Sequence, residues 1–119
     1  MFAPELLDHF QNPRNAGEIA EPDVSVQREN PVCGDVLRLT LRRESDCIAE
    51  VRFLAQGCVA AVACASALTE LVRGKTLSEA RLVQSEDLVR AVGGLPLASS
   101  HASSLAIETL RAALDQLGK

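Results

Sequence analysis

The chain has 119 residues, of which 47% are hydrophobic, and carries a formal net charge of -4 at pH 7. This length favours one domain over residues 1–119, with enough apolar side chains for one core. The acidic balance and the absence of Trp and Tyr argue against a nucleic-acid partner, because the chain lacks both a basic surface and an aromatic stacking platform. No apolar run reaches the roughly 18 residues of a membrane span, and the first residues do not resemble a secretory signal. We therefore expect a cytoplasmic protein without membrane contact.

The first helix is predicted over residues 2–11, where apolar side chains recur at helical spacing. Its buried face is expected to consist of Phe2, Leu6, Leu7 and Phe10. Asn12-Pro13 ends this helix, because a residue before proline avoids the helical conformation. We expect His9 to be exposed, where it pairs with a neighbour or caps the helix.

An antiparallel sheet is predicted next. Residues 24–30 are typical of an edge strand, and residues 36–42 alternate apolar and polar side chains, as a half-buried strand does. Residues 49–55 alternate in the same way, and the polar turn at residues 43–46 makes these two segments a hairpin. Cys47 falls at the opposite end of this hairpin from Gly57. Because a strand rises about 3.3 Å per residue, Cys47 cannot share an ion with a cysteine beyond Gly57.

The central helix is predicted over residues 58–73, with Gly74 as its C-terminal stop. Its side chains are apolar on every face, which is typical of a buried helix. Cys58 opens this helix, and the helix dipole and free backbone N–H groups favour a thiolate there. Cys64 is turned about 240° away from Cys58 around the helix, so we expect it in the core. Cys58 itself is either a ligand or nucleophile, or a small buried hydrophobe.

Three further helices are predicted after Gly74. Thr76 and Glu79 fit a capping box, residues 85–88 fit another helix start, and Gly93-Gly94 ends that helix. Serines at residues 99–104 open a last helix with an apolar stripe, and His101 lies in its first turn. The order of elements predicts an α+β domain, in which a three-stranded antiparallel sheet carries helices on one face.

Four side chains at element boundaries are candidate metal ligands: Cys33, Asp35, Cys58 and His101. Cys33 precedes one strand of the hairpin and Cys58 follows the other, so antiparallel pairing brings these two cysteines to the same end. Two thiolates with an imidazole and a carboxylate suit zinc, or iron with sulfide. The Cys33-Gly34-Asp35 triplet alone is also compatible with an ordinary turn.

The sequence resembles the IscU/NifU-type iron–sulfur cluster assembly scaffolds over nearly its whole length. The resemblance rests on Asp-His-Phe-Gln-Asn-Pro-Arg-Asn at residues 8–15, Pro-Val-Cys-Gly-Asp at residues 31–35, Gly57-Cys58 with the small-residue helix after it, and Leu95-Pro96 followed by His101. No long insertion separates the central helix from Leu95, which favours the IscU/NifU branch over the zinc-containing SufU branch.

The resemblance implies a scaffold and not an enzyme. Such a protein receives sulfur from a cysteine desulfurase, builds a [2Fe-2S] cluster on three cysteines and a fourth ligand, and passes it to apo iron–sulfur proteins. By position, Cys33 and Cys58 match two cluster cysteines. Asp35 matches the aspartate that keeps the cluster labile or supplies an oxygen ligand, and His101 matches the histidine beside the third cysteine.

Two positions depart from the family pattern. Ala102 stands where the family has the third cysteine, which in many members is a principal sulfur acceptor, and an alanine methyl can neither bind a metal nor carry a persulfide. Leu95-Pro96-Leu97-Ala98-Ser99 stands where the family has Leu-Pro-Pro-Val-Lys, the segment that an Hsp70-type chaperone recognises. This chain lacks the second proline and the lysine.

Three hypotheses follow for the function. In the first, the chain is a working scaffold that holds its cluster or metal with Cys33, Asp35, Cys58 and His101. In the second, Ala102 marks a degenerate paralogue that binds zinc or no metal and docks on a desulfurase or a scaffold. The third is a small zinc hydrolase, for which the sequence offers no HExxH-like pair and no general base other than Asp35.

Overall fold

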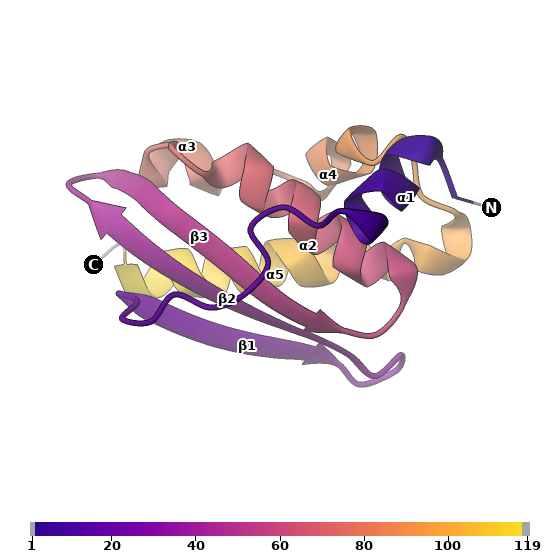
Figure 1. The fold of residues 1–119 in the computed structure, drawn as a ribbon, viewed down its shortest axis with the longest axis horizontal. Coiled ribbons are helices and arrows are strands. Elements are labelled where there is room, and N and C mark those ends of the chain that lie inside the picture. Colours follow the sequence, from indigo (N-terminus) through magenta and orange to yellow (C-terminus); the bar gives the residue numbers. More distant parts are fainter. Residues whose placement is uncertain (1, 118–119) are drawn as a thin grey trace.

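The computed structural model describes residues 2–117, so Met1, Gly118 and Lys119 of the predicted domain lie outside the described residues. Its elements follow the order helix, three strands, helices (Figure 1). In chain order they are α1 (Pro4–Gln11), β1 (Val24–Asn30), β2 (Asp35–Glu44), β3 (Cys47–Gln56), α2 (Val59–Val72), α3 (Leu77–Arg81), α4 (Ser85–Ala91), the 3-10 helix η1 (Leu97–Ser99) and α5 (His101–Leu117).

The three strands form one antiparallel sheet in the order β1-β2-β3, which confirms the predicted fold class. Val36 at the start of β2 pairs with Gln56 at the end of β3, so residues that flank these two positions are neighbours in space. The apolar side chains of β2 alternate as predicted, and Leu37, Leu39 and Leu41 are buried. The sheet therefore presents one apolar face to the helices.

The helices cover that face (Figure 1), and α2 and α5 lie directly on the strands. α2 packs on β3, while α5 packs on β1 and β2. α1 and α4 then cover the outer side of α2, so α2 is surrounded by other elements. This enclosure explains why the helix is apolar on every face. In the described part of the chain, no helix is both long and apolar enough to cross a bilayer.

The segment between α1 and β1 has a structural role that its loop-like sequence did not predict. It runs along the free edge of β3, where the backbone N–H of Gly17 donates to the carbonyl of Phe53 at 2.8 Å. It then crosses the outer sheet face, where the N–H of Ile19 donates to Oγ1 of Thr40 at 3.1 Å. Thr40 is buried for this reason, although the alternation of β2 placed it on the solvent side.

Helix α1 differs from its prediction in the face that it buries. The helix begins two residues later than expected, and Leu6 and His9 are its buried residues. Leu7 and Phe10 are 38% and 39% exposed, so half of the predicted apolar face is open to solvent. The expectation of an exposed His9 is wrong, because this side chain points into the contact with α2.

Helix ends were predicted more accurately. Thr76 and Glu79 form the expected capping box at the start of α3. Gly74 follows α2 with a φ of +84°, a backbone conformation that favours glycine. The capping residue of α4 is Gln84, and its backbone N–H donates to Asp87 at 2.8 Å.

Candidate metal centre

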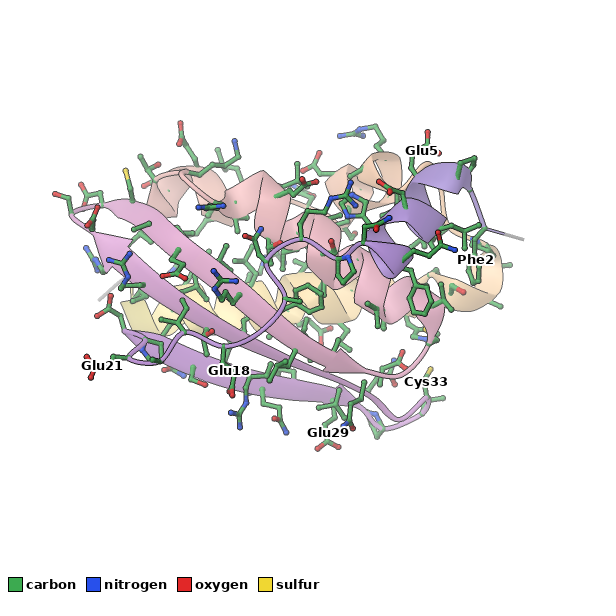
Figure 2. All side chains as sticks on the ribbon, viewed as in Figure 1. Phe2, Glu5, Glu18, Glu21, Glu29 and Cys33 are labelled. Carbon is green, nitrogen blue, oxygen red and sulfur yellow. The ribbon has the colours of Figure 1, made fainter. Side chains whose placement is uncertain are left out.

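Three chain connections meet at one end of the sheet, and each carries predicted site residues. Cys33 lies in the turn between β1 and β2, and Asp35 is the first residue of β2. Cys58 follows β3 and caps α2, and His101 is the first residue of α5. Figure 2 shows Cys33 at this end of the molecule, where β1 turns into β2.

The structure brings the four predicted donors together. Sγ of Cys33 lies 2.9 Å from Nε2 of His101, and this nitrogen lies 3.6 Å from Oδ2 of Asp35. The ligand atoms of these three residues all lie within 4.8 Å of one another. Cys58 joins the group through Asp35, because its Sγ lies 3.5 Å from the same Oδ2. The carboxylate of Asp35 is therefore the centre of the cluster.

The position of Asp35 depends on Gly57, a contact that the sequence did not reveal. Asp35 is only 1% exposed, and its Oδ1 accepts the backbone N–H of Cys58 at 3.0 Å. A Cβ on residue 57 would lie 2.0 Å from that Oδ1, and the φ of Gly57 is +136°. Gly57 is thus the residue that leaves room for the carboxylate, and any side chain there would displace it.

The Cys58 thiol has two opposing influences on its pKa. Partial burial raises the pKa, as does the nearby carboxylate of Asp35, while the backbone N–H of Ala61 lowers it. That N–H donates to Sγ at 3.4 Å, as expected at a helix N-terminus. The raising influences are larger, so the pKa of the Cys58 thiol lies above its ordinary value, although the N–H groups at the helix start act in the predicted direction.

The other two cysteines stand apart from this cluster. Cys47 pairs with Glu44 at the hairpin turn, at the opposite end of β3. Cys64 is fully buried in the core, where burial raises the pKa of its thiol to about 12. A thiol with that pKa stays protonated at neutral pH and is a poor ligand and nucleophile.

Ala102 is buried in the protein. It is 1% exposed and belongs to the hydrophobic core, although it directly follows His101. Its methyl group offers no donor atom at the position where the resemblance implies a third thiol. Among the residues described, the protein supplies two sulfur atoms to this end of the sheet, from Cys33 and Cys58.

The cluster is open to approaching molecules. Val32 is 91% exposed and Leu97 is 90% exposed, and they lie one residue before Cys33 and four residues before His101. A groove of about 740 Å³ lies between α4 and the start of α5 and reaches His101; it is lined by Ser85, Glu86, Val89, Arg90, Ser100, His101, Ser103 and Ser104. A partner can therefore reach the imidazole and the neighbouring thiol.

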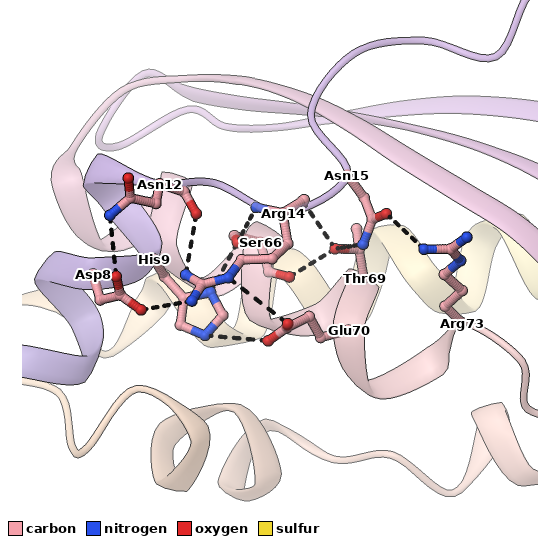
Figure 3. Close-up of polar contacts among 9 residues, drawn as sticks. All are labelled: Asp8, His9, Asn12, Arg14, Asn15, Ser66, Thr69, Glu70 and Arg73. Carbon is pink, nitrogen blue, oxygen red and sulfur yellow. Dashed lines mark hydrogen bonds and ion pairs between the residues drawn. The ribbon is translucent and has the colours of Figure 1, made fainter.

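A second polar cluster holds α1 against α2 (Figure 3). We call it the polar clamp; its members are Asp8, His9, Arg14, Ser66, Thr69 and Glu70. Oγ of Ser66 accepts the backbone N–H of Arg14 at 2.9 Å and lies 2.8 Å from Nδ1 of His9. The guanidinium of Arg14 contacts Asp8 at 2.6 Å. The motif at residues 8–15 thus fastens the first helix to the central helix.

The surroundings of His9 in the polar clamp favour its neutral form. Burial lowers its pKa, and the positive charge of Arg14 lowers it further, against the opposing effect of Glu70 and Asp8. Nε2 of His9 lies 3.6 Å from Glu70. His9 therefore serves the fold, and none of its contacts reaches the four donors at the end of the sheet.

Comparisons with known proteins agree with this architecture. Residues 1–118 match the family described as the NifU-like N terminal domain. The chain belongs to this family. It is 40% identical over 114 residues to the iron-sulfur cluster assembly scaffold protein IscU 1 of Archaeoglobus fulgidus, and the match covers 96% of this chain and 74% of the relative. The resemblance seen in the sequence is confirmed.

Two further matches are a longer relative and a solved structure of similar length. It is 46% identical over 110 residues to the nitrogen fixation protein NifU of Cereibacter sphaeroides, covering 92% of this chain and 45% of that longer protein. Among solved structures, a SUF-system scaffold protein from Fervidobacterium islandicum superposes with a TM-score of 0.81 at 20% identity, over 95% of this chain and 96% of the other. This second likeness establishes the fold alone.

Proposed function

We propose that this chain is an iron–sulfur cluster assembly scaffold. Its cargo is a transient [2Fe-2S] cluster or the metal precursor of one, which it holds at Cys33, Asp35, Cys58 and His101 and passes to apo-proteins. The observation that carries this proposal is the convergence of two thiols, an imidazole and a buried carboxylate at one exposed end of the sheet. A scaffold of this kind acts by binding and release, not as an enzyme.

The donor set fits a temporary cargo. Thiolates and imidazole suit iron–sulfur clusters and zinc, whereas a carboxylate oxygen is a harder and weaker ligand for these metals. Cys33 and Cys58 are both exposed, so a recipient can reach the bound cargo. The Cys58 N–H donates to the Asp35 carboxylate, and the missing side chain of Gly57 leaves room for it. An oxygen donor is therefore kept beside the thiols of Cys33 and Cys58. Both features favour release over permanent binding.

The proposal includes partners and a compartment. The partners are a cysteine desulfurase that supplies sulfur and apo iron–sulfur proteins that accept the product, and the exposed apolar side chains of Val32 and Leu97 beside the donors suit protein contacts. An Hsp70-type chaperone is a further candidate partner at residues 95–99. We place the scaffold domain, residues 1–119, in the cytoplasm.

Anaerobic reconstitution tests the proposal. The protein is incubated with ferrous iron, cysteine and a desulfurase, and its visible spectrum and its iron, sulfide and zinc contents are measured. We expect sulfide-to-iron charge-transfer bands with iron and sulfide in equal amounts, and their loss in Cys33→Ser. A colourless protein with an intact fold would contradict the scaffold proposal.

Ala102 favours a second candidate function. With one thiol fewer than the scaffold pattern that the sequence resembles, the site could hold zinc or no metal, and the chain would then act by docking on a desulfurase or on another scaffold. Zinc binds well to two cysteines, one histidine and one carboxylate in a closed tetrahedral site. The same reconstitution separates the two functions, because this second candidate yields zinc or no metal and no inorganic sulfide.

A further inference from the structure

The donor cluster has fewer sulfur atoms than an iron–sulfur cargo usually receives. It supplies two, from the exposed Cys33 and Cys58, whereas iron–sulfur clusters are commonly held by four cysteine thiolates. The other two cysteines of the chain add none, because Cys64 is fully buried and Cys47 lies at the opposite end of β3. An additional sulfur ligand can therefore come only from another molecule.

A groove in the protein surface leads to this donor cluster. It has a volume of about 740 Å³ and lies between α4 and the start of α5, where His101 forms part of its wall. Nε2 of the same His101 lies 2.9 Å from Sγ of Cys33. The volume falls within the range of roughly 300–1,000 Å³ that is typical of small-molecule sites. A small molecule in this groove would therefore contact a residue of the donor cluster.

The polar groups of the groove match a ligand that carries both a carboxylate and an ammonium group. Glu86 and Arg90 line one wall, and their spacing along α4 places an anion and a cation one helical turn apart. Asp87 contacts one terminal nitrogen of Arg90, but a guanidinium has five N–H donors and can bind a second carboxylate. The hydroxyls of Ser100 and Ser104 on the opposite wall can donate to or accept from either group.

We propose that this groove binds a small peptide thiol of the glutathione class, whose sulfur becomes an additional ligand of the cargo. Arg90 binds a carboxylate of this thiol, Glu86 binds its ammonium group, and the sulfur atom lies at the His101 end. The inference rests on the proposed scaffold function and adds to it a ligand site outside the four donors. When the sulfur binds the metal, the thiol proton passes to solvent, and neither an oxidant nor a reductant is needed.

A ligand that is not part of the chain suits a cargo that has to leave. The two charged residues of the groove are exposed, so salt screens their attraction to the ligand. We therefore expect weak binding that exchanges quickly and loosens further as the salt concentration rises. The additional sulfur can then dissociate together with the cargo or ahead of it.

Binding in the groove is tested on the metal-free protein with S-methylglutathione, which keeps the charged groups of glutathione but offers no thiolate. An NMR titration should show saturable chemical-shift changes at Ser85, Val89 and Ser104. Arg90→Ala should weaken binding by roughly fivefold, because it removes one exposed ion pair. Arg28→Ala is the matched control, since Arg28 is an exposed arginine on β1 that does not line the groove.

Circular dichroism checks that both variants are folded, and the wild-type titration needs no variant at all. Chemical shifts that do not change around the groove would overturn the proposal. An equal loss of affinity in Arg90→Ala and Arg28→Ala would also overturn it, because the attraction would then be a general effect of surface charge.

Sulfur ligation is tested on the protein loaded with cobalt(II), which takes the place of zinc and reports thiolate ligands by charge-transfer absorption. We expect glutathione to raise this absorption saturably, from the level of two thiolates to that of three, and S-methylglutathione to leave it unchanged. Mercaptoethanol, a thiol without charged groups, should require a much higher concentration. A spectrum that glutathione leaves unchanged, or a response that is the same in Arg90→Ala, would contradict the proposal, as would removal of the cobalt by glutathione.

Failure of this inference differs from failure of the proposed function. Reconstitution with ferrous iron and inorganic sulfide is carried out with and without glutathione. A cluster that forms equally well in both cases, on a protein whose groove binds no S-methylglutathione, refutes the thiol site and leaves the scaffold intact. A protein that forms no cluster in either case refutes the scaffold itself.

Discussion

The donor cluster, which consists of Cys33, Asp35, Cys58 and His101, and the polar clamp are both built from motif residues with polar or sulfur atoms. They differ in whether these atoms bond within the protein or stay accessible to a ligand. In the polar clamp, the hydroxyl of the buried Ser66 hydrogen-bonds with both the His9 ring and the Arg14 backbone N–H. Its hydrogen bonds are therefore made within the protein. In the donor cluster, Cys33 and Cys58 are exposed, and their sulfur atoms lie at the surface-facing end of the sheet, where a ligand can reach them. Residues that satisfy one another stabilise a fold, whereas accessible soft donors remain available for a ligand.

The comparison also separates two uses of histidine. His9 is 7% exposed and is enclosed by α1 and α2, where burial lowers its pKa. His101 is partly exposed at the start of α5, beside a thiol and a carboxylate. The same side chain is therefore a structural hydrogen-bonding group at one site and a candidate ligand at the other.

The largest expected effect is the loss of metal binding when a thiol of the donor cluster is removed. Cys33→Ser and Cys58→Ser should each weaken zinc or ferrous iron binding by about 100-fold or more, because direct ligands matter at least as much as the second-shell groups that already contribute 10–100-fold. Isothermal titration calorimetry measures this. Cys47→Ser is the matched control, and equal losses in all three variants would refute the ligand assignment.

Gly57→Ala should damage the donor cluster without replacing any of its four donor residues. The new Cβ would lie 2.0 Å from Oδ1 of Asp35, so the carboxylate must move, and we expect metal affinity to fall by about 10-fold or more. Gly74→Ala is the control, because its φ is also positive but nothing lies within 4 Å of its added Cβ. If both variants lose the same affinity, backbone strain and not Asp35 is the cause.

Ser66→Ala should destabilise the polar clamp and lower the stability of the fold, while metal affinity stays the same. The substitution leaves the buried Nδ1 of His9 and the Arg14 N–H without their partner, which costs about 1–3 kcal/mol in the free energy of unfolding. Urea denaturation measures the loss, and the exposed Ser25→Ala is the control, with a change within about 0.5 kcal/mol. Metal affinity of the folded protein should stay unchanged; a parallel loss would mean that the two regions are coupled.

The smallest expected effect is a dependence of stability on pH through His9. Its pKa in the folded protein lies below the ordinary value of 6.5, so the unfolded chain binds a proton first as the pH falls. The stabilisation that comes from the neutral His9 is therefore fully present above pH 6.5. The free energy of unfolding should decrease as the pH falls from 6.5 towards the folded pKa of His9. Denaturation at several pH values should show this slope, and His9→Asn should flatten it, whereas carboxylates such as Asp8 act only at lower pH.

The sequence predicted the sheet and the long helices well because their signals are local. Leu37, Leu39 and Leu41 alternate with polar residues on one strand, and the all-apolar helix after Cys58 has to be buried. The gathering of Cys33, Asp35, Cys58 and His101 was also predictable, because each lies at an element boundary and antiparallel pairing brings such boundaries together. These inferences need only periodicity and topology.

Other features depended on contacts between segments far apart in the chain. His9 is buried because Ser66, 57 residues later, offers it a partner, and Thr40 is buried because the segment after α1 crosses the sheet. In the sequence, Gly57 only marks the boundary between a strand and a helix. The structure shows that the Asp35 carboxylate occupies the space that a side chain at residue 57 would fill. Helical spacing predicts a stripe of candidate core residues, but the packing partner decides which part of it is covered, as Leu7 and Phe10 show.

The most direct test of the central claim is the X-ray absorption spectrum of the metal-loaded protein, recorded for wild type and for Cys33→Ser. The account predicts two protein sulfur atoms and at least one nitrogen or oxygen atom from Asp35 or His101 in the metal coordination shell, with one protein sulfur lost in the variant. With zinc, which brings no sulfide of its own, these scatterers can be counted without interference. A metal bound by oxygen and nitrogen alone, or a spectrum unchanged in Cys33→Ser, would contradict the assignment of this end of the sheet as the cargo site.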